Sequence, residues 1–224
     1  MKYTIVLFLG LASADRATTT RYFDCSGGSC GCGFGSEDPR IMCHSNALRA
    51  APSGNPHGAL FYGTAAVSQA LGGGDWLAGA CGKCFALTGE SNVPGSYGSK
   101  TVIVKATNYC PPGNPVCSNW NKHFDIIAPG FDYPNQSISN TCWKEGISGL
   151  QTPQTCAYWM INSQNPQENC NCDQINDPVL KQGCHNFLSL GWNNPEVDYY
   201  EVDCPSELVH SPPCWDDNGQ NWPA

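Results

Sequence analysis

The chain has 224 residues, of which only 13% are charged, and a formal net charge of −8 at pH 7. This acidic balance excludes most nucleic-acid-binding proteins, because binding phosphates needs a basic surface. We therefore expect no nucleic-acid partner and favour a neutral polymer. The 24 glycines and 17 prolines predict many turns and few long helices.

Residues 1–14 have the pattern of a secretory signal peptide. Lys2 gives a basic start, residues 5–11 are apolar, and Ala12-Ser13-Ala14 is a small-residue cleavage site. A buried first strand is the alternative. No later segment reaches the ~18 apolar residues that span a bilayer. We expect a secreted, extracellular monomer with no membrane partner, in which residues 15–224 form a single domain without a linker to a separate binding module.

The remaining chain predicts short strands joined by long loops. The β-branched and apolar runs favour strands, the Ala-rich run before a triple glycine favours a helix, and a second helix fits a late segment. In chain order, we expect a strand over 20–24, a helix over 63–71, strands over 84–88, 101–107 and 124–128, a helix within 178–190, and a strand over 199–203. This order suggests a closed β-barrel. In the first strand Thr20, Tyr22 and Asp24 would share one face.

Fifteen cysteines follow the signal-like segment, and in an exported protein they predict disulfides. Seven bridges would leave one cysteine over. Zinc is the competing interpretation, since Cys81-x-x-Cys84 has the spacing of metal ligands. The other tight pairs are Cys-x-Cys pairs at residues 30/32 and 170/172, and we expect no metal or other cofactor.

Two carboxylates are the candidate catalytic residues. Asp24 follows Tyr22 and Phe23, and Asp125 lies in an apolar run that begins with His123. Cleavage of a glycosidic bond needs one carboxyl group to protonate the leaving oxygen and another to activate water. Burial should raise the pKa of Asp125, as a general acid requires. A capping or surface role for Asp24, and simple hydrogen bonding for Asp125, are the alternatives.

Other chemistry has weaker support. His123 lacks an accompanying serine or cysteine nucleophile motif and more simply supports its neighbours by hydrogen bonding. The seven tryptophans and nine tyrosines include candidate platforms for sugar rings, although most buried aromatic residues are core. Asn135 begins an Asn-x-Ser acceptor pattern for N-glycosylation.

Four motifs in this order resemble glycoside hydrolase family 45 endoglucanases. They are Thr-Thr-Arg-Tyr-Phe-Asp-Cys at 19–25, Gly-Ala-Cys-Gly-Lys-Cys-Phe at 79–85, His-Phe-Asp-Ile-Ile-Ala-Pro-Gly at 123–130 and Val-Asp-Cys-Pro-Ser-Glu-Leu-Val at 202–209. The closing segment 214–224 is similar to the end of that family's catalytic domain. The resemblance implies a mainly β fold, a six-stranded double-psi β-barrel with long disulfide-bridged loops and a few short helices. It also implies endo-hydrolysis of β-1,4-glucan with inversion.

The resemblance also implies residue roles. Asp24 takes the position of the general base and Asp125 that of the general acid. Thr20 and Tyr22 match groove residues before the base, and His123 matches the residue beside the acid. In another branch of the family, an asparagine at the place of Asn108 has a part in catalysis; the alternative for Asn108 is a turn residue that closes a strand.

Two positions depart from many fungal members. The stretch 111–121 contains no aspartate that could assist catalysis, and Cys32 stands where those members have a tryptophan platform. These departures indicate a different branch of the family. The main alternative is an expansin-like protein that binds or loosens cell walls without hydrolysis, because expansins share the barrel, the cysteine pattern, the Thr-Asn-Tyr-Cys-Pro-like stretch and the His-Phe-Asp motif. Expansins lack a carboxylate equivalent to Asp24. A barwin-like defence protein is a third interpretation and explains neither Asp24 nor the closing segment.

Overall fold

The structure is a computed structural model that describes residues 14–23, 28–32, 40–118, 120–131, 156, 169–209 and 214. Asp24, the proposed glycosylation site at Asn135 and residues 1–13 of the predicted signal peptide lie outside the described residues. Among the helices of the described part, none has the length and apolar character needed to cross a membrane.

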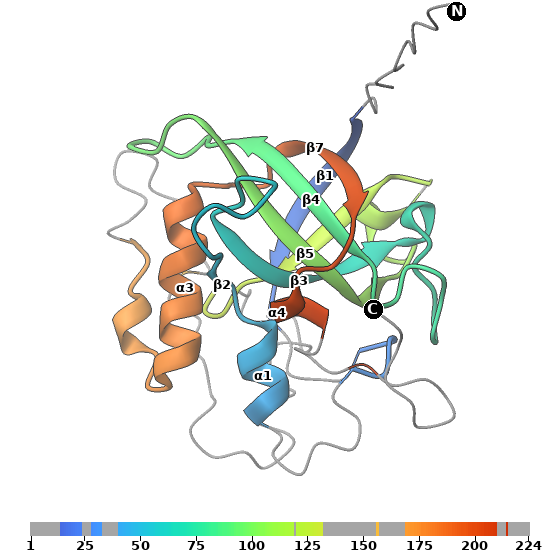
Figure 1. Cartoon of the computed structure of the whole chain (residues 1–224), viewed down its shortest axis with the longest axis horizontal. Helices are drawn as coiled ribbons and strands as arrows, with labels where there is room; N and C mark the ends of the chain where they lie inside the picture. The colour runs from blue at the N-terminus through green and yellow to red at the C-terminus, as the bar shows by residue number, and fades with distance from the viewer. Residues whose placement is uncertain are drawn as a thin grey trace, which may run out of the picture.

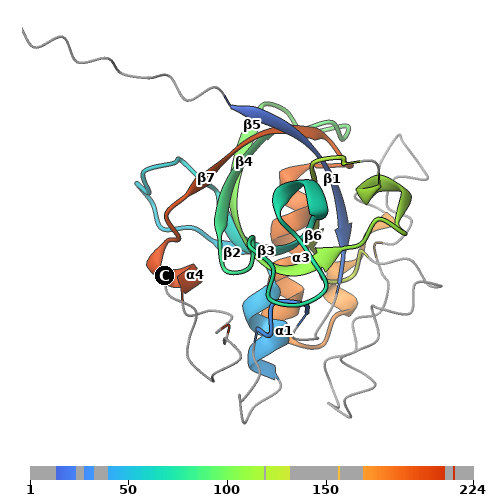
Figure 2. The same cartoon turned by 90° about the vertical axis from the view of Figure 1, so that its right-hand side faces the viewer.

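Six strands form a closed barrel, with a seventh short strand at its edge. Hydrogen bonding runs in the order β2-β3-β5-β4-β7-β1-β6, and an additional pairing of β3 with β6 closes the ring (Figures 1 and 2). The strands are β1 (Asp15–Tyr22), β2 (Arg49–Ala50), β3 (Phe61–Ser68), β4 (Cys84–Glu90), β5 (Ser99–Cys110), β6 (His123–Ile127) and β7 (Glu196–Val202).

The ring combines parallel and antiparallel pairs of strands. The pairs β1–β6 and β3–β5 are parallel, whereas the other neighbours in the ring are antiparallel. Parallel neighbours cannot be joined by a tight hairpin, so each parallel pair encloses a long segment of chain. The expected fold class, a six-stranded double-psi β-barrel, is confirmed.

Alternate residues of the strands fill the barrel. Phe85, Phe124 and Tyr199 come from three different strands, and their ring centroids lie 5.3 to 6.3 Å apart with edge-to-face geometry. Such edge-to-face contacts are favourable beyond the area that they bury. The interior is therefore a packed core rather than a ligand cavity, and function has to be sought on the outer walls and at the ends.

The predicted helix over 63–71 is wrong. This segment is strand β3 followed by a single 3-10 turn, Gln69–Leu71. Helix propensity is overridden because β3 pairs with β5 on one side and β6 on the other, and seven of its eight residues are buried. Small residues suit this crowded position: a Cβ on Gly63 would lie 3.2 Å from the Leu48 side chain.

The other expected elements are found, mostly with longer bounds. Strands β4, β5, β6 and β7 cover the four predicted later strands, with shifts of one to three residues at some ends. The opening strand begins earlier than predicted, at Asp15, and ends at Tyr22, so the expected face-sharing of Asp24 is not tested. Within the described ranges, the remaining helical elements are α1 (Arg40–Asn46), α3 (Pro178–Leu190), α4 (Ser206–Val209), and 3-10 turns at Pro115–Cys117 and Cys172–Gln174.

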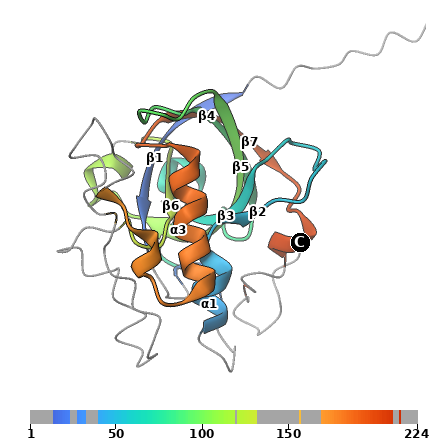
Figure 3. The same ribbon diagram turned by 90° about the vertical axis from the view of Figure 1, so that its left-hand side faces the viewer.

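Helix α3 covers one end of the barrel (Figures 2 and 3). Its N-cap is Asp177, whose carboxylate accepts hydrogen bonds from the backbone amides of Val179 and Leu180, and it ends at Gly191 with a φ of 64°. Phe187 packs edge-to-face on Phe131, just after β6. The opposite end of the barrel is left to the loops that follow β3 and β5 (Figure 2).

Disulfides cross-link segments all around the barrel. Six bridges are described: Cys30–Cys81, Cys32–Cys214, Cys84–Cys204, Cys110–Cys117, Cys156–Cys170 and Cys172–Cys184. Cys43 is disulfide-bonded as well, and no cysteine in the described part of the chain is free. The two sulfurs of the Cys81-x-x-Cys84 motif belong to different bridges, so this motif holds no zinc.

Candidate active site

Strand β6 presents His123 and Asp125 on the outer wall of the barrel. The residues between and after them, Phe124 and Ile126, point inward, where Phe124 contacts Phe85 and Tyr199. Because side chains alternate along a strand, His123 and Asp125 share the outer face. The two apolar residues directly beside Asp125 in the sequence, Phe124 and Ile126, are thus core residues behind the strand, and Asp125 itself is half-buried.

Strand register places four residues in one line across the wall. Thr20 on β1 pairs with Asp125 on β6; Asp125 pairs with Ala66 on β3, and Ala66 pairs with Asn108 on β5. Directly paired residues point to the same face, so we call Thr20, Asp125, Ala66 and Asn108 the cross-strand row. With strands roughly 4.8 Å apart, the backbones of Asp125 and Asn108 are about 10 Å apart. Ala66 places only a methyl group between them.

A chain of hydrogen bonds leads to the Asp125 carboxyl group. The Thr18 hydroxyl is 2.8 Å from His123 Nδ1, the Thr20 hydroxyl is 2.8 Å from His123 Nε2, and Thr20 donates to Asp125 Oδ1 at 2.7 Å. A hydroxyl has a single proton. Since Thr20 gives its proton to Asp125, it accepts from Nε2–H, and Nδ1 of neutral His123 accepts from Thr18. This pattern fixes the direction of every hydrogen bond from Thr18 to the carboxyl group.

His123 is fully buried, and burial lowers its pKa to about 4. It is therefore neutral near pH 7 and brings no positive charge to Asp125. Its backbone amide donates to the Ser68 hydroxyl at 3.1 Å, which in turn donates to the backbone carbonyl of Asn121. The Cys110–Cys117 disulfide lies against the imidazole, with the sulfurs and a ring nitrogen within 4.8 Å of one another. Because these sulfurs form a disulfide, they are not thiolate ligands for a metal.

The Asn108 side chain is held by contacts on both of its polar atoms. Its amide donates to the Tyr22 hydroxyl at 3.3 Å, and its carbonyl accepts from the backbone amides of Ser29 and Tyr109 at 2.9 and 2.8 Å. Gly28 packs so closely that a Cβ there would lie 2.8 Å from the Asn108 side chain. Gly28 and Ser29 thus pack against the cross-strand row.

Of the six site residues predicted from the sequence, five are described and lie together on this wall: Thr20, Tyr22, Asn108, His123 and Asp125. Asp24 lies outside the described residues. The sequence reasoning missed Thr18 and Ser68, which both bind His123. Thr18 had a visible signal, since it stands two residues before Thr20 and so shares its face. Ser68 had none, because it lies in the segment predicted as a helix.

An exposed aromatic side chain close to the cross-strand row could serve as a platform for a sugar ring. In the described part of the chain, the large exposed aromatic residues are Trp76, Tyr97, Trp120 and Tyr200. Trp76 and Trp120 lie on the loops after β3 and β5, near the cross-strand row in sequence and topology. Leu77 and Trp120, in these same loops, are two of the three non-glycine residues that have a positive φ within the described ranges. Trp192, by contrast, is core.

Comparison with known proteins agrees with this geometry. A family model described as EXPB1-like domain 1 matches residues 17–129, half of the chain. An endoglucanase-5 from Hypocrea jecorina is 39% identical over 151 residues, which are 57% of this chain and 57% of that protein. Expansin-A21 from Arabidopsis thaliana is 41% identical over 80 residues, covering 34% of this chain and 28% of that protein. The chain thus spans just over half the length of the endoglucanase.

A crystal structure of a cellulase from the Antarctic springtail Cryptopygus antarcticus has the same fold. It superposes with a TM-score of 0.55 at 21% sequence identity, and the match covers 89% of this chain and 96% of that one. The identity is low, so this likeness supports the double-psi barrel alone. The resemblance to endoglucanases and expansins noted in the sequence motifs is confirmed by the named relatives.

Proposed function

The chain belongs to the EXPB1-like domain 1 family, and we propose that within it this protein is a secreted endo-β-1,4-glucanase. Its substrate is cellulose or a related β-glucan, which it hydrolyses at internal bonds with inversion. The observation that carries the proposal is the half-buried Asp125 carboxyl group, which accepts a hydrogen bond from Thr20 at 2.7 Å and is backed by a buried, neutral histidine. Endoglucanases among its relatives support the reaction class.

Asp125 is the proposed general acid. Oδ1 accepts the Thr20 proton, so a proton for the leaving glycosidic oxygen is held more readily on Oδ2. His123 is neutral at working pH because its pKa is about 4, and it orients Thr20 rather than exchanging a proton with substrate. Positioning of this kind fixes which oxygen delivers the proton and in which direction.

Asp24 is the proposed general base. It follows β1 by two residues and precedes the segment that packs on Asn108 through Gly28 and Ser29. Inversion requires the two carboxyl groups to stand roughly 6.5–9.5 Å apart, so that a water fits between base and sugar. We assign Thr20, Tyr22, Asn108 and His123 to substrate binding and positioning, with Asn108 and Tyr22 held toward each other by their hydrogen bond.

Export and domain organisation complete the proposal. Residues 1–14 act as the signal peptide, and residues 15–224 form one catalytic domain that works as a monomer. Strand β1 begins at Asp15, directly after the proposed cleavage site, and the thirteen described cysteines are all disulfide-bonded, as suits an oxidising compartment.

The decisive test is release of reducing ends from a soluble β-1,4-glucan and from mixed-linkage glucan. Wild type should be active, and Asp24→Ala and Asp125→Ala should each lose nearly all activity while keeping the wild-type melting temperature within a few degrees. The anomeric form of the first product, followed by NMR, should be inverted. Activity retained in Asp24→Ala would move the base role to Asn108 or its neighbours, and a product of retained configuration would refute inversion.

A second candidate function is non-hydrolytic wall loosening of the expansin type. The match to an expansin-type domain and the expansin among its relatives favour it. The discriminating result is hydrolysis itself: an oxidised, folded wild type that binds cellulose but releases no reducing ends, and that weakens cellulose networks under load, would establish this second function and exclude the first.

A further inference from the structure

A hollow of about 730 Å³ lies on a different part of the outer wall, between the loop before β3 and the end of β7. Its lining comes from Pro56, His57, Tyr62, Tyr200, Glu201, Val202, Asp203, Cys204 and Pro205. None of these residues belongs to the cross-strand row. The ring-lined hollow, as we call it, is therefore separate from the proposed site of cleavage.

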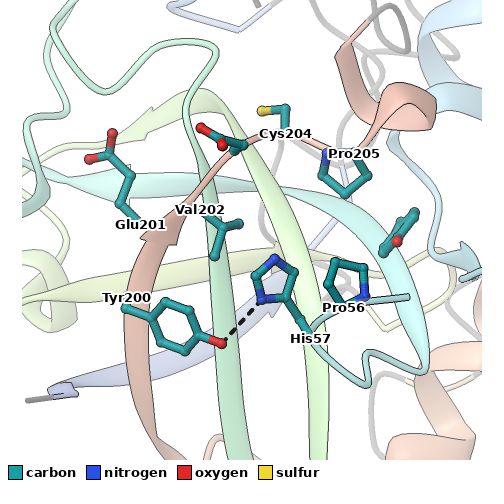
Figure 4. Close-up of a pocket in the computed structure, with 9 residues that line it drawn as sticks. Pro56, His57, Tyr200, Glu201, Val202, Cys204 and Pro205 are labelled. Carbon is teal, nitrogen blue, oxygen red and sulfur yellow. Dashed lines mark hydrogen bonds between the residues drawn. The ribbon is translucent and has the colours of Figure 1, made fainter. Parts of the chain in front are cut away.

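Its walls are mainly the faces of rings. The Tyr200 ring is 41% exposed, and its hydroxyl is 3.3 Å from His57 Nδ1, which holds the two rings with centroids 6.0 Å apart. Figure 4 shows the imidazole lying between Tyr200 and Pro56. The Tyr200 ring thus offers a flat, partly exposed surface, and its hydrogen bond with His57 holds it in place.

The polar groups around the hollow select the kind of ligand. Glu201 pairs with Lys83 at 3.0 Å, and its side chain points away from His57 (Figure 4). Asp203 makes no described hydrogen bond or ion pair, so its carboxylate can accept hydrogen bonds from a ligand. Among the described residues, no lysine or arginine lines the hollow, which disfavours an anion. A pyranose fits this set, since it has apolar ring faces for Tyr200 and hydroxyl donors for Asp203 and His57.

We propose that the ring-lined hollow is a second saccharide-binding site that holds a segment of β-1,4-glucan while another segment is cleaved at the cross-strand row. The identity of the glucan rests on the proposed function. Binding at two sites on one polymer raises the local concentration of chain at the site of cleavage without any change in the chemical step. Short substrates that reach only the cross-strand row gain nothing from it.

The test compares Tyr200→Ala with Tyr97→Ala, since Tyr97 is another exposed tyrosine, 83% exposed, but lies outside the hollow. For phosphoric-acid-swollen cellulose at about 4 °C, Tyr200→Ala should raise the apparent Kd roughly five- to tenfold. Tyr97→Ala should bind like wild type. On cellotetraose both variants should keep kcat/KM within about twofold of wild type. Tyr200→Phe, which keeps the ring, should retain most of the binding.

A second measurement needs no variant of the hollow. A thio-linked cello-oligosaccharide, which resists hydrolysis, should shift the imidazole NMR signals of His57 in wild type and leave those of His185 unchanged. His185 is a suitable control because it is also exposed and lies on α3.

Each result has a distinct meaning. Unshifted His57 signals, or equal cellulose binding by Tyr200→Ala and wild type, would overturn the second site. An equal loss of kcat/KM on cellotetraose in Tyr200→Ala would also overturn it, because the hollow would then belong to the cleavage site. A wild type that shifts His57 but releases no reducing ends would keep the saccharide site and reject only the proposed hydrolysis.

Discussion

Polar side chains on the two outer walls of the barrel have different kinds of hydrogen-bond partner. On the wall formed by β1, β6 and β3, the buried His123 is hydrogen-bonded to Thr18 and Thr20, and Thr20 is in turn hydrogen-bonded to the partly exposed Asp125. These hydrogen bonds all join one side chain to another, and the last of them ends at the Asp125 carboxyl group, which can react. It is the arrangement expected where an acid must be aimed.

On the wall formed by β2, β3, β4 and β5, a buried lysine and a half-buried arginine donate hydrogen bonds to backbone carbonyls instead. Lys105, only 3% exposed, donates to the carbonyl of Val209 at 2.9 Å, and Arg49 donates to the carbonyl of Glu207. Both carbonyls belong to α4, which packs on this wall through Leu208 beside Tyr62 and Ile103. Burial and the nearby Arg49 lower the pKa of Lys105 to about 8. The comparison teaches that a buried titratable group indicates a catalytic site only when it is hydrogen-bonded to a side chain network that reaches the surface, as His123 is and Lys105 is not.

The largest effect should come from the end of the first network. Asp125→Asn removes the proton donor and should lower kcat on β-glucan by about 10²-fold or more. Aryl cellobiosides with good leaving groups need less protonation, so their loss should be much smaller. Kinetics on both substrates check this. Equal losses on both would contradict the acid role, and Asp203→Asn, in the ring-lined hollow, should leave kcat on aryl cellobiosides unchanged.

Acid should destabilise the first wall through His123. Its pKa is 6.5 when unfolded and about 4 when folded, so the unfolded chain takes up a proton first as pH falls. The stabilisation is complete above about pH 6.5 and is lost progressively down to about pH 4, by up to about 3 kcal/mol. His123→Gln does not titrate and keeps an N–H for Thr20. The difference in unfolding free energy between wild type and variant, from urea melts, should therefore fall only in this window; a flat difference would refute it.

Two matched Thr→Val substitutions, one on each wall, should have smaller effects on stability and kcat that differ between the walls. Thr20→Val leaves the buried N–H of His123 without an acceptor and should cost about 1–3 kcal/mol of stability, together with a roughly tenfold loss of kcat. Thr88→Val removes the hydrogen bond of 2.9 Å to Thr101 on the other wall. It should cost only about 0.5–1.5 kcal/mol and leave kcat unchanged. Loss of activity in both variants would mean that the walls are not independent.

Most strands and the long helix can be predicted from the local sequence. Strand β3 cannot, and the reason is physical. The strand at 101–107 is evident because its β-branched residues suit a pleated surface, and α3 because Asp177 and Gly191 cap it. Strand β3 is misleading, since its Ala and Gly residues favour a helix locally. Only its position between two partner strands explains why small residues are needed there.

The site shows the same division. Motifs predict Asp125 and Thr20 as site residues, and the structure places them opposite each other on neighbouring strands. The approach of Asn108 to Tyr22 was not foreseeable, because it depends on a shift in register between Ala65 and Ala66 that sets Asn108 opposite Ala66. Register shifts of this kind are set by tertiary packing rather than by the residues on either side.

The cross-strand row forms only when the barrel closes during folding. Ala66 is the middle one of the three β3 residues that pair with β6, and it is also the link between Asp125 and Asn108. Contacts between residues so far apart in the chain form late and slowly. A partly folded molecule with an open ring would have every side chain of the site and yet no site. Recovery of enzymatic activity during refolding should consequently follow ring closure itself and serve as its kinetic reporter.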